Sequence, residues 1–170
     1  KDGKHLYVAN LLPAGRADAN YISSEISIIE TRTNKVLKNI QLPNGSTAIR
    51  DICISPDGKH VYATHILGRY QMPTTQLERG WMNTNALTII DADEQKYINT
   101  VLLDDIDLGA ANPWSVSCTA DGKFICVTHA GTHEISVIDR GGLHEKLDKA
   151  SGGYKFSNAL NAMASPEDVP

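Results

Sequence analysis

The chain of 170 residues has a formal net charge of −4, with 41% hydrophobic and 21% charged residues. This acidic balance argues against nucleic acid as a partner, because such binding requires a basic face. The apolar content is sufficient for a packed core. No apolar run approaches the ~20 residues needed to cross a bilayer, so we expect no membrane span.

A repeated pattern runs along the chain. An Asp-Gly turn followed by alternating apolar residues occurs as DGKHLYVAN from Asp2, DGKHVYATH from Asp57 and DGKFICVTH from Asp121. A matching segment follows each copy: EISIIE from Glu25, ALTIID from Ala86 and EISVID from Glu134. Asp-Gly favours a tight turn, and alternation of apolar and polar residues predicts a β-strand. Each copy therefore predicts two adjacent strands.

Further strands complete the unit. A third strand is predicted by KVLKNIQL from Lys35 and KYINTVLL from Lys96, and a strand before the turn by IRDICIS from Ile49 and PWSVSCT from Pro113. The unit is thus a four-stranded antiparallel meander. The Asp-Gly turns recur at longer intervals than the ~40–50 residues of a propeller blade. The excess falls between the second and third strands, as insertions at 11–24 and 66–85.

These motifs resemble the YVTN family of β-propeller repeats, in ISPDGKHVYATH and in SCTADGKFICVTH followed by EISVID. The resemblance implies an all-β fold of propeller blades and a protein of the periplasm or cell surface. The chain departs from the family pattern at Ala120 and Cys126, and His65 and His129 replace the terminal Asn that is kept at Asn10.

The repeat predicts an incomplete ring of about two and a half to three blades over residues 1–140. Because closed propellers have 4–8 blades, we expect the remaining blades of a parent propeller, or another copy, to cover the apolar flanks. An open antiparallel sandwich is the alternative. Residues 141–170 break the repeat and predict an irregular, partly helical excursion, with helical stretches at Leu143–Lys149 and Ser157–Ala164.

The insertions and the connections between blades should share one face of the disc, because alternate turns of a meander point to opposite faces. This loop face is where we expect a protein or small-molecule ligand to bind. Aromatic, Arg and amide side chains predict the site: Arg69, Tyr70, Gln71, Gln76, Glu78, Arg79 and Trp81. The alternative is that this loop only packs on the neighbouring insertion.

Histidines and cysteines give weaker signals. His65, His129 and His133 could converge as metal ligands, or the first two could be hydrogen-bonded strand-end residues in place of the family Asn. His5, His60 and His144 are predicted to be ordinary surface residues. The cysteines, Cys53, Cys118 and Cys126, are predicted to be small buried hydrophobic residues, with a Cys118–Cys126 hairpin bridge as the alternative.

No complete catalytic motif is present. We therefore expect a non-catalytic binding or scaffold module outside the cytoplasm, with no cofactor of its own. The alternative is a redox-associated propeller whose loop face contacts a metal, a haem or a fused cytochrome-type domain. The chain lacks the CxxCH motif that attaches a c-type haem, so any haem would lie outside it.

Overall fold

The computed structural model describes residues 2–70, 82–104 and 110–151, and within these it contains three antiparallel sheets. The first sheet has the order β1-β2-β3, made of β1 (His5–Ala9), β2 (Glu25–Glu30) and β3 (Lys35–Gln41). The middle sheet is the four-stranded meander β4 (Ser46–Ile54), β5 (His60–Gly68), β6 (Asn83–Asp91) and β7 (Lys96–Leu102). The third sheet contains β8 (Pro113–Cys118), β9 (Phe124–His129) and β10 (Glu134–Asp139). The predicted strands and their antiparallel pairing are confirmed.

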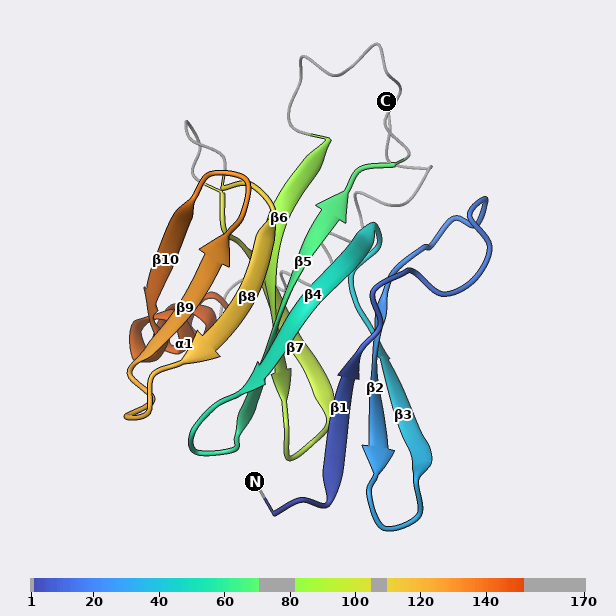
Figure 1. Cartoon of the computed structure of the whole chain (residues 1–170), viewed down its shortest axis with the longest axis horizontal. Coiled ribbons are helices and arrows are strands. Elements are labelled where there is room, and N and C mark those ends of the chain that lie inside the picture. The colour runs from blue at the N-terminus through green and yellow to red at the C-terminus, as the bar shows by residue number, and fades with distance from the viewer. Residues whose placement is uncertain (1, 71–81, 105–109, 152–170) are drawn as a thin grey trace.

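The sheets pack side by side in chain order, with the middle sheet between the other two (Figure 1). One apolar cluster fills the interface between the first and middle sheets, with members such as Ile26, Ile28 and Val61. A second cluster fills the interface between the middle and third sheets, with members such as Tyr62, Ile89 and Val127. Each face of the middle sheet therefore packs against a different neighbour, as in successive propeller blades and unlike a two-sheet sandwich.

The three Asp-Gly turns have the same local structure. In each, the lysine two residues on donates its backbone N–H to the Asp side chain at 3.1 Å, in the pairs Lys4–Asp2, Lys59–Asp57 and Lys123–Asp121. The glycines have positive φ angles of 71°, 77° and 70°, for Gly3, Gly58 and Gly122, a conformation that glycine adopts without steric cost. The repeat is thus preserved at the level of hydrogen bonds.

The connections separate onto two faces. The Asp-Gly turns lie at one end of the sheets, and the β1–β2 insertion lies at the other end, together with the β3–β4 connection (Figure 1). A backbone bond from Gly45 N to Ile22 O at 2.8 Å joins these last two segments, and a bond from Ala48 N to Leu11 O at 2.9 Å joins the insertion to the start of β4. We call the end of the sheets that holds the Asp-Gly turns the turn face. The predicted loop face lies at the opposite end.

A helix follows the last strand directly. Helix α1 (Arg140–Ser151) includes the predicted stretch Leu143–Lys149 but starts three residues earlier, so that Gly141 and Gly142 belong to its first turn. The side chain of Asp139 accepts a bond from Gly142 N at 2.8 Å and caps the first turn, which offsets the helix cost of glycine. Leu143 and Leu147, four residues apart, then pack on the second apolar cluster. The stretch Ser157–Ala164 lies outside the described residues, and a separate unit at 141–170 stays a prediction.

Candidate functional site

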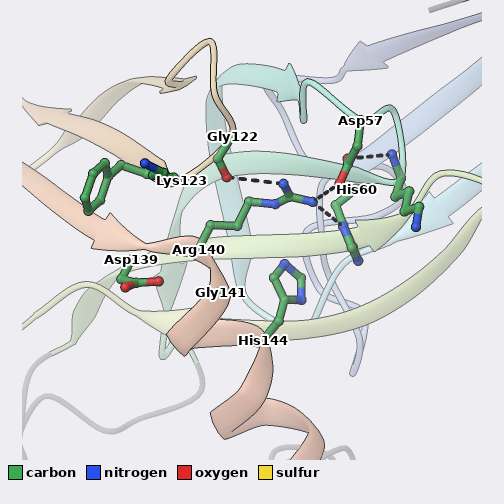
Figure 2. Close-up of a pocket in the computed structure, with 10 residues that line it drawn as sticks. Asp57, His60, Gly122, Lys123, Asp139, Arg140, Gly141 and His144 are labelled. Carbon is green, nitrogen blue, oxygen red and sulfur yellow. Dashed lines mark hydrogen bonds and ion pairs between the residues drawn. The ribbon is translucent and has the colours of Figure 1, made fainter.

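A pocket lies on the turn face, where the Asp-Gly turns of the middle and third sheets meet the start of α1 (Figure 2). Its volume is about 520 Å³. The lining residues come from both turns, the end of β10 and α1: Asp57, Lys59, His60, Gly122, Lys123, Phe124, Asp139, Arg140, Gly141 and His144. Two equivalent turns of the repeat thus form one concave site between neighbouring sheets.

Arg140 is the centre of this site, and its side chain is only 14% exposed. Its guanidinium forms an ion pair with Asp57, donates to the Tyr62 hydroxyl at 3.1 Å and donates to the Gly122 carbonyl at 3.3 Å. Figure 2 shows the side chain reaching from the start of α1 to both turns. Arg140 therefore ties three elements together with charge-assisted bonds, which are stronger than neutral ones.

Asp57 has a pKa well below its usual range. Burial by itself would raise this pKa, but hydrogen bonds from Ser55 at 2.5 Å, from Arg140 and from Lys59 N outweigh that effect. The carboxylate is therefore ionised throughout the physiological pH range. It completes the Asp-Gly turn with one oxygen and binds Arg140 with the other.

Two imidazoles lie beside the guanidinium. The rings of His60 and His144 are tilted against each other with centroids 4.1 Å apart. Burial lowers the pKa of His60 and Arg140 lowers it further; burial, His60 and Arg140 lower the pKa of His144. His60 Nδ1 lies 3.3 Å from a guanidinium nitrogen of Arg140. Because arginine can only donate, His60 Nδ1 is the acceptor of this bond. Both rings are thus neutral near pH 7.

Tyr62 connects this cluster to the core. Burial raises its pKa to about 12, so the phenol keeps its proton. Its oxygen accepts a hydrogen bond from Arg140 and lies 2.8 Å from Nε2 of His144, within hydrogen-bond distance. Lys59 and Lys123 are exposed beside the pocket, and its lining also contains Asp57 and Asp139, so the pocket presents charges of both signs.

We expect Tyr62→Phe to lower the free energy of unfolding by about 1 kcal/mol, because two nitrogens then lose their partner. Denaturant unfolding of the full-length protein that carries this chain measures the change. Tyr70→Phe is the control, since the hydrogen bonds of the Tyr70 hydroxyl are exposed and their loss should lower the free energy of unfolding less than the loss of the Tyr62 hydroxyl. Equal effects of the two substitutions would contradict the role of Tyr62.

The loop-face residues predicted from sequence are described only in part. Tyr70 donates its hydroxyl to the carbonyl of Asn20 at 2.9 Å and to the side chain of Asn44 at 2.8 Å. These contacts join the second insertion to the first and to the β3–β4 connection. Arg69 N bonds to Met82 O at 2.7 Å at the base of the loop. The other predicted residues, Gln71, Gln76, Glu78, Arg79 and Trp81, lie outside the described residues.

The repeat-equivalent histidines are hydrogen-bonded inside the sheets. His65 Nε2 lies 2.8 Å from the Thr88 hydroxyl, and His129 Nε2 lies 2.8 Å from the Ser136 hydroxyl. In the first copy, Asn10 makes the same bond to Ser27, at 2.9 Å. This pattern favours the strand-end interpretation of the two histidines.

His133, the third predicted metal ligand, is an exposed turn residue with a φ of 58°. Across residues 2–70, 82–104 and 110–151, no three His, Cys, Asp or Glu side chains form a group that could hold a metal ion. In the same part of the chain, no helix is long and apolar enough to cross a membrane.

Sequence reasoning missed the turn-face pocket, and the assignment of His60 and His144 as ordinary surface residues is wrong: both are half-buried around Arg140. A signal was present in the repeat. Thr31, Ala92 and Arg140 occupy the same position, since each donates its N–H to the carbonyl of the Asp-Gly lysine of its own copy. Only the third copy has a cation there, and this departure marks the site.

Three antiparallel meanders, each packed on the next, define the chain as part of an all-β propeller. The comparisons with known proteins agree with this fold class. No protein-family model matches the chain, so the resemblance to YVTN repeats stays a prediction.

The chain is 26% identical over 136 residues to hydrazine synthase subunit beta of Kuenenia stuttgartiensis, a match that covers 80% of this chain and 33% of that protein. The structure of Kuenenia stuttgartiensis hydrazine synthase superposes with a TM-score of 0.73 at 24% identity, covering 86% of this chain and 40% of the matched one. A Bacteroides fragilis protein provisionally assigned as a 6-phosphogluconolactonase superposes with a TM-score of 0.54 at 20% identity, covering 82% and 33%.

The chain thus spans about a third of the length of the curated relative that it matches. The two structural neighbours differ in the activities their names give, so the shared fold alone assigns no activity.

Proposed function

We propose that this chain is the propeller segment of a subunit that binds partner subunits in a multi-protein redox enzyme, and that its role is docking and scaffolding. The observation that carries the proposal is the 26% identity over 136 residues to hydrazine synthase subunit beta. This function joins the two hypotheses drawn from sequence, because the module binds, and the redox chemistry belongs to its partners. The periplasm or cell surface, implied by the family resemblance, is the proposed location.

The loop face has the features of a protein-docking surface. Large apolar side chains are exposed on the first insertion, with Leu12 exposed to 72% and Leu11 to 47%. Tyr21 and Tyr70 are also exposed and lie close together, because the Tyr70 hydroxyl bonds the carbonyl of Asn20. Exposed apolar and aromatic side chains on a rigid scaffold favour contact with another protein.

Apolar side chains are exposed on the outer faces of the first and third sheets, and this supports the proposal that further blades pack on both. On the third sheet, Ile135 and Val137 are exposed to 64% and 62%. On the first sheet, Leu6, Ile29 and Val36 form one row across the three strands, according to the strand register. We propose that the remaining blades of the parent propeller cover these apolar rows, with another copy of the chain as the alternative.

The test is co-purification of the tagged full-length parent protein from its native cells. We expect it to retain partner subunits, detected by mass spectrometry and by the absorbance of any redox centre that they hold. Leu11→Glu should weaken this association at least about tenfold, because it places a charge in the docking surface. The matched control is Leu37→Glu on β3, where a leucine of similar exposure (50%) lies away from the loop face. Equal retention by both variants, or a parent that purifies alone, would refute the docking role.

A further inference from the structure

Two cysteines from different sheets face each other across the second core interface. Cys53 lies near the end of β4 and Cys118 at the end of β8, and their sulfur atoms are 3.8 Å apart. They are 65 residues apart in sequence. Both pack on the apolar cluster that joins the middle and third sheets.

The strand register explains why these two thiols meet. Cys53 pairs with Tyr62 across the middle sheet, and Cys118 pairs with Ile125 across the third, so each cysteine shares the face of a buried residue of the same interface. Cys126 pairs with Val137 and therefore lies on the opposite face of the third sheet. The Cys118–Cys126 bridge considered from sequence is thus wrong, because the two side chains point away from each other.

We infer that Cys53 and Cys118 are a redox pair, which closes to a disulfide that links the two neighbouring sheets. All three cysteines are free thiols in the structure. Bond formation requires the sulfur atoms to approach from 3.8 Å to about 2 Å, a movement within the reach of side-chain rotation. The link would join adjacent sheets near the turn-face pocket.

The oxidant of this step is a small disulfide such as oxidised glutathione. The thiolate of Cys118 attacks one oxidant sulfur, so that a mixed disulfide forms, the oxidant S–S bond breaks and one thiolate leaves. The thiolate of Cys53 then attacks Sγ of Cys118, and the second oxidant thiolate leaves. Two electrons pass from the protein sulfurs to the oxidant, and the two protons from the protein thiols convert the leaving thiolates into thiols.

The surroundings of the sulfurs set this order. Burial raises the pKa of Cys53 far above its usual range, and the neighbouring Cys118 raises it further. Burial also raises the pKa of Cys118, but the hydrogen bond with Cys53 and the charge of Arg140 offset part of this effect. Cys118 is therefore the better entry point for the oxidant, and both steps are slower than for an exposed thiol.

The native full-length protein is incubated with oxidised glutathione, its free thiols are blocked with N-ethylmaleimide, and it is digested with trypsin without reduction. The lysines and arginines place the three cysteines in separate peptides, namely 51–59, 97–123 and 124–140. We expect a disulfide to join peptides 51–59 and 97–123, and reduction to separate them. Cys126 in peptide 124–140 should carry N-ethylmaleimide. Free Cys53 and Cys118, a lasting glutathione adduct, or a link to Cys126 would overturn the inference.

Thermal unfolding of the oxidised and reduced full-length protein gives a second readout. Because a long loop is closed, we expect oxidation to raise Tm by roughly 5 °C or more. This difference should disappear in Cys118→Ser and Cys53→Ser and persist in the matched control Cys126→Ser. Loss of the difference in Cys126→Ser, or its persistence in Cys118→Ser, would contradict the pairing. The peptide map of the unmodified sequence remains decisive if a serine variant fails to fold.

Discussion

Acidification from pH 7 to pH 4 is expected to lower the free energy of unfolding by about 3 kcal/mol through His65 alone. Burial lowers the pKa of His65 from 6.5 to about 4. Between these values the unfolded chain binds a proton that the folded chain does not, so stability is complete above pH 6.5 and falls as the pH approaches 4. Such a difference in pKa corresponds to about 3 kcal/mol.

The substitution that isolates this effect is His65→Asn, because Asn10 makes the equivalent bond in the first copy. Denaturant unfolding of the full-length protein at several pH values between 4 and 8 measures it. We expect the loss of free energy of unfolding between pH 7 and pH 4 to be about 3 kcal/mol smaller in the variant than in the unsubstituted protein. Parallel profiles for His65→Asn and the parent would show that His65 does not titrate as inferred.

Replacing Arg140 with methionine is expected to lower the free energy of unfolding by about 2 kcal/mol. The methionine keeps much of the packing but removes the bonds to Asp57, Tyr62 and Gly122. The value is below that of a fully buried ion pair, because the Asp57 side chain is 38% exposed and partly solvated. Denaturant unfolding measures the loss. If the slope of the free energy of unfolding against denaturant concentration is unchanged, the variant still unfolds as one unit.

Arg140→Lys tests whether geometry or charge is responsible. Lysine keeps the charge but lacks the planar fork that reaches three partners, so we expect most of the loss to remain. A double-mutant cycle with Asp57→Asn should give a coupling of about 1 kcal/mol between the two side chains. A coupling near zero would mean that the ion pair does not hold the two sheets together. Full recovery with lysine would mean that the charge alone is responsible and that the planar fork of Arg140 is not needed.

The strands and their pairing were predictable because the repeat imposes the same turn and the same alternation in each copy. Asp57 and Asp121 open equivalent turns, and the register of the hairpins follows from them. The same reasoning predicted that the insertions share a face, because that depends only on the order of the strands.

The pocket was harder to predict, because Asp57 and Arg140 are 83 residues apart and belong to different copies. Their contact depends on how sheets pack, which periodicity within one strand does not specify. The start of α1 was missed for a local reason, since the Asp139 cap overrides the glycines that follow it. The pairing of Cys53 with Cys118 likewise depends on which face of each sheet a side chain occupies.

In each copy one side-chain hydrogen bond joins the residue just before the loop-face segment to the strand that follows the segment. The residues that make this bond are Asn10, His65 and His129. Because this hydrogen bond lies at the strand end where the loop begins, residues can be added to the loop or removed from it while the two strands keep their register. The first two copies carry long insertions after this hydrogen bond, and the third carries a short turn. Loops of different lengths can therefore follow the same hydrogen bond without a change in the framework of strands.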